Sequence, residues 1–134
     1  MVVDSSALVC LVFDEAEAEA FRAAIDGDAV RLLSAVTFLE ASIVVEARGG
    51  EAAATLLDEL LREIGARVEV VTIAQAEVAR EAWRRFGKGR HPAALNFGDC
   101  FSSALSRTAG QPLLCKGNDV PRTDLRLVFG PAAP

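Results

Sequence analysis

The stretch that decides the fold is the opening of the chain, MVVDSSALVCLVFDE (residues 1–15). Three apolar residues precede an acid at Asp4, and this pattern predicts a short buried strand that ends there. Ser5 or Ser6 can cap a following helix at 7–13, because a serine hydroxyl accepts from the first free backbone N–H groups of a helix. A strand that is apolar throughout, without polar alternation, is typical of a parallel sheet covered on both faces.

The same alternation of short apolar runs and helical segments continues along the chain. We predict further strands at 29–34, 68–71 and 113–115, with 125–129 as a fifth in the larger version of the sheet. Helical periodicity predicts helices at 15–26, from 36 to the stop at Gly49-Gly50, and at 51–64, 73–86 and 97–108. We therefore expect one α/β domain over residues 1–134, a three-layer α/β/α sandwich around a short, mainly parallel sheet of four to five strands.

Composition and charge narrow the class of protein. The 134 residues are 51% hydrophobic and 25% charged, as expected for one globular domain. The net charge of −5 does not point to a nucleic-acid binder, although local patches decide such binding and totals do not.

Neither a membrane segment nor a cysteine framework is expected. No apolar run approaches the roughly 18 residues of a membrane span, and the first residues lack signal-peptide features, so we expect a cytoplasmic protein with no membrane partner. Cys10, Cys100 and Cys115 are odd in number and lack CxxC spacing. This favours small buried side chains over disulfides or a zinc site.

Four acidic residues fall where the predicted elements reach one edge of the sheet. Asp4 ends the first strand, Asp119 follows the fourth, and Glu40 and Asp99 lie in the first turns of two helices. In open α/β sheets, ligands bind outside the carboxyl ends of the strands. Each acid also has a purely structural explanation, since the helix dipole favours Asp99 and turns favour aspartate.

The charge of this group calls for a cation. No Lys or Arg lies within five residues of Asp4, Glu40 or Asp99. Two carboxylates about 4 Å apart repel by about 4 kcal/mol at an effective dielectric constant near 20. Oxygen ligands select a hard cation such as Mg²⁺ or Mn²⁺, and such a metal can activate water and neutralise charge on a phosphodiester.

Four segments, taken in order, resemble the PIN-domain family, and specifically the VapC-type ribonuclease toxins of bacterial toxin–antitoxin pairs. The first is the opening quoted above, with the first acid. The others are similar to the family's second-acid helix, third-acid segment and last strand with its loop: SAVTFLEASIVVEAR (34–48), RFGKGRHPAALNFGDCFSSALS (85–106) and LLCKGNDVPRTDL (113–125).

The resemblance implies a Mg²⁺- or Mn²⁺-dependent endoribonuclease that forms a homodimer and is held inactive by a VapB-type antitoxin. By their place in these segments, Asp4 and Asp99 match the principal metal ligands, and Glu40 matches the acid that holds the water. Asp119 matches the fourth, more variable acid, and Asn118 stands where many relatives have another Asp. Asp124 is a weaker candidate for that corner and is expected to cap a loop.

A basic segment precedes Asp99. Arg84, Arg85, Lys88 and Arg90 lie close together, against the acidic average of the chain. We expect these side chains to contact RNA phosphates on the approach to the acids. The alternative is a solvated helix end, where cations suit the C-terminal dipole.

Rival functions remain open from the sequence. A PIN-like binding module without catalysis is the alternative to the nuclease, although the complete acid set favours the nuclease. A phosphatase or nucleotide-binding domain requires a glycine-rich loop after the first strand, where this chain has Ser5-Ser6-Ala7. The apolar stripes at 15–26 and 51–64 exceed what one sheet face requires, which favours a surface for a partner.

Overall fold

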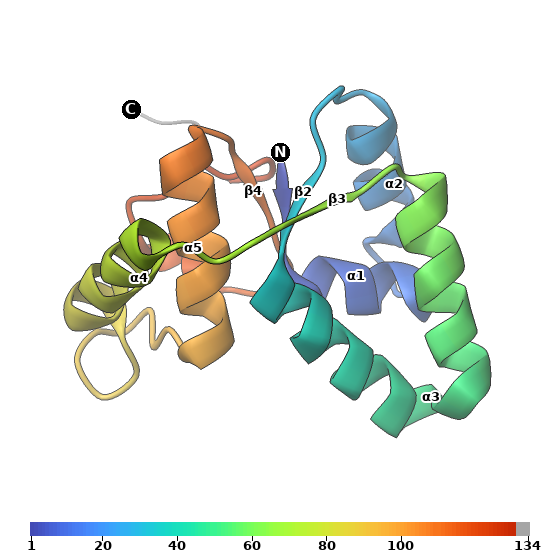
Figure 1. Cartoon of the computed structure of the whole chain (residues 1–134), viewed down its shortest axis with the longest axis horizontal. Helices are drawn as coiled ribbons and strands as arrows, with labels where there is room; N and C mark the ends of the chain where they lie inside the picture. The colour runs from blue at the N-terminus through green and yellow to red at the C-terminus, as the bar shows by residue number, and fades with distance from the viewer. Residues whose placement is uncertain (131–134) are drawn as a thin grey trace.

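The strands form one parallel sheet, as the sequence predicts. A computed structural model describes residues 1–130 (Figure 1), and the predicted domain end at residue 134 lies outside them. The strand order is β3-β2-β1-β4 and every neighbouring pair is parallel. The strands are β1 (Val2–Val3), β2 (Leu32–Ser34), β3 (Arg67–Glu69) and β4 (Leu113–Leu114).

The helices connect these strands and cover both faces of the sheet. They are α1 (Ser5–Val12), α2 (Ala18–Asp26), α3 (Ala35–Glu63), α4 (Ile73–Phe86) and α5 (Phe97–Ala109), and a 3₁₀ turn, η1, spans Val120–Arg122. Figure 1 shows α4 and α5 on one side of the sheet and α1, α2 and α3 on the other.

Neighbouring residues of β1, β2 and β4 face the two helical layers. The layer of α1, α2 and α3 packs on Val3, Leu33 and Leu114, and the layer of α4 and α5 packs on the residue before each of these. Successive side chains of a strand point to opposite faces, so a sheet buried between two layers needs two apolar residues in a row. The predicted three-layer α/β/α architecture is confirmed.

Two features differ from the sequence-based expectation. Among the described residues, 125–129 form no fifth strand, since Leu127 alone pairs with Leu113 in an isolated bridge. β3 is an exposed edge strand, with Val68 46% exposed, because none of its residues packs into either of the two core clusters of the described chain. The break predicted at the glycine pair is confirmed, because the non-helical φ of 68° at Gly50, which glycine tolerates, divides α3 into two helical arms at a kink.

The cysteines behave largely as predicted. Cys10 and Cys100 are buried, Cys115 is half-buried, and all three are free thiols. Within residues 1–130, no helix combines the length and apolar character needed to cross a membrane.

Candidate metal centre

The strand order explains why residues from distant parts of the chain meet. The chain passes from β1 to β2 and β3 on one side and returns to β4 on the other, so the order reverses between β1 and β4. Ligands bind at the carboxyl ends of the strands where such a reversal occurs. Asp4 follows β1 and Asp119 lies beyond β4, whereas Glu40 and Asp99 enter from the N-terminal turns of α3 and α5.

Asp4 is the most buried of these four acids, with 3% of its surface exposed. Its Oδ2 accepts from the Ser6 backbone N–H at 3.0 Å and from the Ser6 hydroxyl at 2.6 Å, and its Oδ1 accepts from the Ser102 hydroxyl at 2.6 Å. Asp4 is therefore the N-cap of α1. The prediction that Ser5 or Ser6 caps this helix is wrong, because the helix begins at Ser5, earlier than expected.

Glu40 is half-buried between α1 and α5. The Ser5 hydroxyl donates to its Oε1 at 2.5 Å. Gly98, in the first turn of α5, leaves the space that this carboxylate occupies: a Cβ there would lie 2.5 Å from Glu40 Cδ and would collide with Oε2. The absence of a side chain at Gly98 is thus part of the geometry of the site.

Asp99 is fixed at the start of α5 by a reciprocal cap. Its backbone N–H donates to Asn96 Oδ1 at 2.9 Å, and its own Oδ2 accepts from the Asn96 backbone N–H at 3.0 Å. Burial raises the pKa of Asp99 to about 6, against the lowering effect of the Asn96 hydrogen bond, and the nearby charges of Asp4, Glu40 and Asp119 raise it further.

The structure groups Asp119, and not Asp124, with the other three acids. Asp119 is exposed at the start of η1 and acts electrostatically on Asp99. Asp124 instead accepts hydrogen bonds from Arg85, at 2.9 Å, and from Arg107. These bonds hold its pKa below the usual range although burial opposes them, so Asp124 ties the last described turn to α4 and α5.

No cation of the described chain neutralises the four acids. Asp4, Glu40, Asp99 and Asp119 make no salt bridge within residues 1–130. Lys116 follows β4, but its Nζ atom lies 2.5 Å from Glu15 Oε2 and 2.9 Å from Glu17 Oε2. Asp4, Glu40 and Asp99 are therefore left with hydroxyl and backbone N–H donors.

Lys116 pairs with one acidic group of the described chain and not with the acids at the sheet edge. Within the described residues, the cluster whose ligand atoms lie within 4.8 Å of one another is Cys10, Glu15 and Glu17, and there the Lys116 ammonium already supplies the charge. The acids at the sheet edge are spaced more widely. Mg²⁺ usually binds one or two carboxylates and keeps several waters, so this wider, uncompensated oxygen set fits such an ion.

The four predicted RNA-contacting side chains divide into two groups. Arg84 and Arg85 pair with acids of the chain, at 3.8 and 2.9 Å. The Arg90 guanidinium carbon lies over the Trp83 indole ring, 4.2 Å from the ring centroid. Lys88 is exposed and makes no ion pair in the described part of the chain. Lys88 and Arg90 are therefore freer than Arg84 and Arg85 to meet a ligand.

Sequence reasoning missed Thr37, Gly98 and Ser102 and assigned Ser5 and Ser6 only a capping role. Thr37 and Ser102 are buried, and their hydroxyl oxygens are 3.0 Å apart. Their polarity on otherwise apolar helix faces was a signal. Thr37 bonds to Ser102 and Ser102 bonds to Asp4, and both partners lie too far away in the sequence for a local pattern to reveal them.

Known proteins are similar to this chain over nearly its whole length. The PIN domain family model matches residues 1–125. Ribonuclease VapC30 of Mycobacterium tuberculosis is 47% identical over 131 residues, which covers 98% of this chain and 100% of that protein. Ribonuclease VapC of Mycolicibacterium smegmatis is 47% identical over 128 residues, with 96% and 99% covered. The crystal structure of Mycobacterium tuberculosis VapC20, described as a sarcin–ricin loop cleaving toxin, matches with a TM-score of 0.77 at 22% identity and covers 95% and 97%.

The chain belongs to the PIN-domain family and, within it, to the VapC ribonucleases. The resemblance carried by the four sequence segments is confirmed, as is the α/β fold, which VapC20 shares. The chain is accordingly a hydrolase of the ribonuclease class and a toxin of the toxin–antitoxin type. The roles of individual residues stay predictions.

Proposed function

We propose that this protein is a Mg²⁺- or Mn²⁺-dependent endoribonuclease whose catalytic residues are Asp4, Glu40, Asp99 and Asp119. One observation carries the proposal: four acids from separate elements meet at the carboxyl edge of the sheet, and no described cation neutralises them. The raised pKa of Asp99 supports it, because the fold alone disfavours this much negative charge. A divalent cation relieves that cost.

Asp4 and Asp99 would hold the metal ion. Asp4 Oδ2 accepts two hydrogen bonds, which use both of its lone pairs, whereas Oδ1 accepts one and keeps a lone pair for a ligand. When bound, the metal would lower the pKa of a water and stabilise charge on the phosphodiester. Glu40, held at Oε1 by Ser5, keeps Oε2 available to orient that water and take its proton.

The basic loop supplies affinity for the RNA backbone. Lys88 and Arg90 are exposed next to the helix that carries Asp99, and phosphate contacts of this kind are independent of sequence. Arg85 is committed to Asp124. We therefore expect Arg85→Ala to lower stability more than it lowers RNA binding.

The test is cleavage of total cellular RNA with Mg²⁺ or with a chelator. We expect cleavage with Mg²⁺ only, and we expect Asp4→Asn and Asp99→Asn to abolish it while circular dichroism shows an intact fold. Asp58→Asn, on the exposed side of α3, is the matched control and should cleave like the wild type. Full activity in either site variant, or cleavage that persists in chelator, contradicts the proposal.

The alternative is a PIN-like binding module without catalysis. It predicts RNA binding with no cleavage by the wild type in Mg²⁺ or Mn²⁺. The two acid candidates for the fourth position separate in the same assay. We expect Asp119→Asn to reduce cleavage and Asp124→Asn to lower the melting temperature with cleavage retained.

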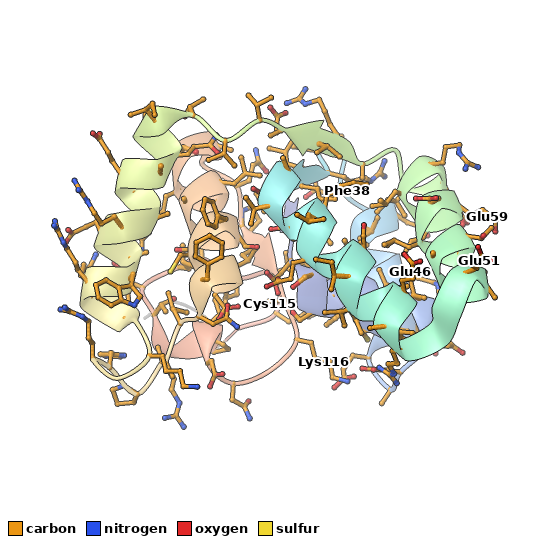
Figure 2. The ribbon with its side chains drawn as sticks, turned by 60° about the horizontal axis from the view of Figure 1, so that its bottom comes forward. Phe38, Glu46, Glu51, Glu59, Cys115 and Lys116 are labelled. Carbon is orange, nitrogen blue, oxygen red and sulfur yellow. The ribbon has the colours of Figure 1, made fainter. Side chains whose placement is uncertain are left out.

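We also propose that the toxin forms a homodimer and binds a VapB-type antitoxin, with apolar surfaces on α3, α4 and α5 available for these contacts. The first arm of α3, which precedes the kink at Gly50, exposes four apolar side chains: Phe38 (37%), Leu39 (58%), Ile43 (59%) and Val44 (42%). Figure 2 shows Phe38 on that arm, while Glu51 and Glu59 lie along the second arm. A groove of about 390 Å³ between α4 and α5 is lined by Ala76, Ala79, Arg80, Trp83, Phe97, Cys100 and Phe101.

These surfaces differ from the stripes at 15–26 and 51–64 that first suggested a partner. Most apolar residues of those stripes pack into the core of the chain itself, where Phe21, Ile25 and Leu57 are buried. The apolar area exposed on α3 and in the groove between α4 and α5, in contrast, is of the kind that commonly marks an interface.

Sedimentation at tens of micromolar tests the homodimer. The wild type should be dimeric, and Leu39→Glu or Ile43→Glu should shift it to a monomer. Leu56→Glu, at a residue 50% exposed on the second arm of α3, is the control and should leave the dimer intact. A monomeric wild type, or dissociation by the control alone, contradicts the assignment.

A further inference from the structure

Two hydroxyl side chains that the proposed chemistry does not use lie buried behind Asp4. Thr37 is 0% exposed and Ser102 is 1% exposed. Thr37 Oγ1 lies 3.0 Å from Ser102 Oγ, and Ser102 Oγ lies 2.6 Å from Asp4 Oδ1. The three residues come from α3, α5 and the end of β1, so the chain of hydroxyls links both helical layers to the acid.

Counting protons gives the direction of these hydrogen bonds. An ionised carboxylate only accepts, so Ser102 must give its single proton to Asp4. Thr37 must therefore donate to Ser102. The order Thr37 → Ser102 → Asp4 Oδ1 aligns both hydroxyl dipoles toward the carboxylate, and aligned hydrogen bonds of this kind strengthen one another.

The other oxygen of Asp4 is held differently. Ser6 donates to Oδ2 through both its backbone N–H and its hydroxyl, and the Ser6 hydroxyl accepts from the Lys116 backbone N–H at 2.9 Å. Both lone pairs of Oδ2 are thereby used. The remaining lone pair is on Oδ1, the oxygen that Ser102 orients.

Helix α5 itself shows that this arrangement is specific. Hydroxyls within a helix usually bond to a nearby carbonyl, as Thr108 does with Ala104 O. Ser102 instead bonds to an acid from β1. Its neighbour Ser103 is equally buried, at 1% exposed, and its hydroxyl has no partner among the described residues. Burial on this face therefore does not by itself bring a hydroxyl to Asp4.

We propose that Ser102 and Thr37 are positioning residues, which fix the Asp4 carboxylate and orient the free lone pair of Oδ1 toward the bound cation. The proposal rests on the proposed metal-dependent function. Thr37 touches neither metal nor RNA in this arrangement and acts through Ser102. Partners of metal ligands typically change metal affinity by about 10- to 100-fold when they are removed.

The experiment measures Mn²⁺ binding to the full-length protein by electron paramagnetic resonance, together with RNA cleavage kinetics. We expect Ser102→Ala to raise the Kd for Mn²⁺ about tenfold or more, with the KM for RNA unchanged at saturating Mn²⁺. Thr37→Val, which keeps the shape and removes the donor, should raise the Kd by a smaller factor, about threefold. Added to Ser102→Ala, it should have no further effect, because the chain is already broken.

Ser103→Ala is the matched control. It removes a buried hydroxyl from the same helix, one residue away, and should leave the Kd for Mn²⁺ unchanged. Should Ser102→Ala fail to fold, Thr37→Val alone still tests the proposal, since the hydrogen bond from Ser102 to Asp4 remains in place.

The outcomes separate this inference from the function on which it rests. A wild type that neither binds Mn²⁺ nor cleaves RNA overturns both. A wild type that does both, with Ser102→Ala and Thr37→Val binding Mn²⁺ equally well, overturns the positioning role alone. Equal losses in Ser102→Ala and Ser103→Ala would show a general packing effect and would also overturn it.

Discussion

Replacing Asp99 by Asn should make the metal-free protein more stable. The pKa of Asp99 is about 6 in the folded chain, against 3.8 for an ordinary aspartate. Each pKa unit corresponds to 1.36 kcal/mol, so the ionised carboxylate costs at most about 3 kcal/mol at neutral pH. Because Asp99 is only partly buried and water screens part of this cost, we expect a gain of about 1–2 kcal/mol for the variant.

The sign of the effect follows from the two pKa values. Below pH of about 3, the carboxyl is protonated in both folded and unfolded chains, and the variant gains nothing. As the pH rises from about 3 to about 6, the unfolded chain, with its pKa of 3.8, ionises first and the wild type loses stability relative to Asp99→Asn. Above pH of about 6 the whole difference is present. Asn keeps an oxygen that can accept from the Asn96 backbone N–H, so the helix cap survives.

Thermal unfolding in chelator at several pH values measures this gain. For a chain of this size, 1–2 kcal/mol corresponds to a melting temperature higher by about 3–8 °C. Saturating Mg²⁺ should reverse the order, because a ligand at about 100 times its Kd stabilises the wild type by about 2.7 kcal/mol and the variant lacks one of the carboxylates. Asp58→Asn, an exposed control, should change neither value. A variant that is no more stable than the wild type at pH 7.5, or a gain that persists undiminished at pH of about 3, refutes the reasoning.

Two further predictions concern the glycine beside the acids and the basic loop. Gly98→Ala should displace the Glu40 carboxylate and lower kcat by about 100-fold with little change in fold. Gly27→Ala is the control in the same kinetic assay and should leave kcat unchanged, because a Cβ at Gly27 meets only ordinary contacts. Replacing Lys88 and Arg90 with Ala should raise the KM, leave kcat unchanged and flatten the salt dependence by about 0.7 per lost contact; an unchanged KM and slope at two salt concentrations would mean that the loop is only solvated.

Much of the fold follows from local patterns. The apolar pair before Asp4 and the switch to helical spacing after it predict a buried parallel strand, and the 73–86 helix is found with those bounds. The burial of a strand is different, because it depends on which elements pack over its two faces in the folded chain. Val68 looks like a core residue in the sequence, yet it lies on the edge strand β3, whose residues join neither core cluster of residues 1–130. The segment 125–129 fails as a strand for a related reason, because it meets β4 in one bridge only.

The candidate site divides in the same way. The four acids could be predicted because strand ends and helix starts are local features, and the sheet rule then brings them to one edge. The groups that hold them could not be predicted, because their partners are far away in the sequence. Gly98 falls in the first turn of the helix predicted at 97–108, and its contact with Glu40 exists only in the folded chain. Arg85 has the appearance of an RNA ligand until Asp124 is found beside it.

The chain holds two acidic groups in opposite electrostatic states, and the contrast argues for the role of one of them. Hydrogen bonds from Lys116 lower the pKa of both Glu15 and Glu17, so that group carries its own cation. Lys116 could not serve both groups. Its backbone N–H supports Ser6 behind Asp4, while its ammonium is committed to the glutamates, and Asp99 is left with a raised pKa. A fold that has a lysine beside the sheet edge and pairs it elsewhere keeps the edge open for a cation from solution.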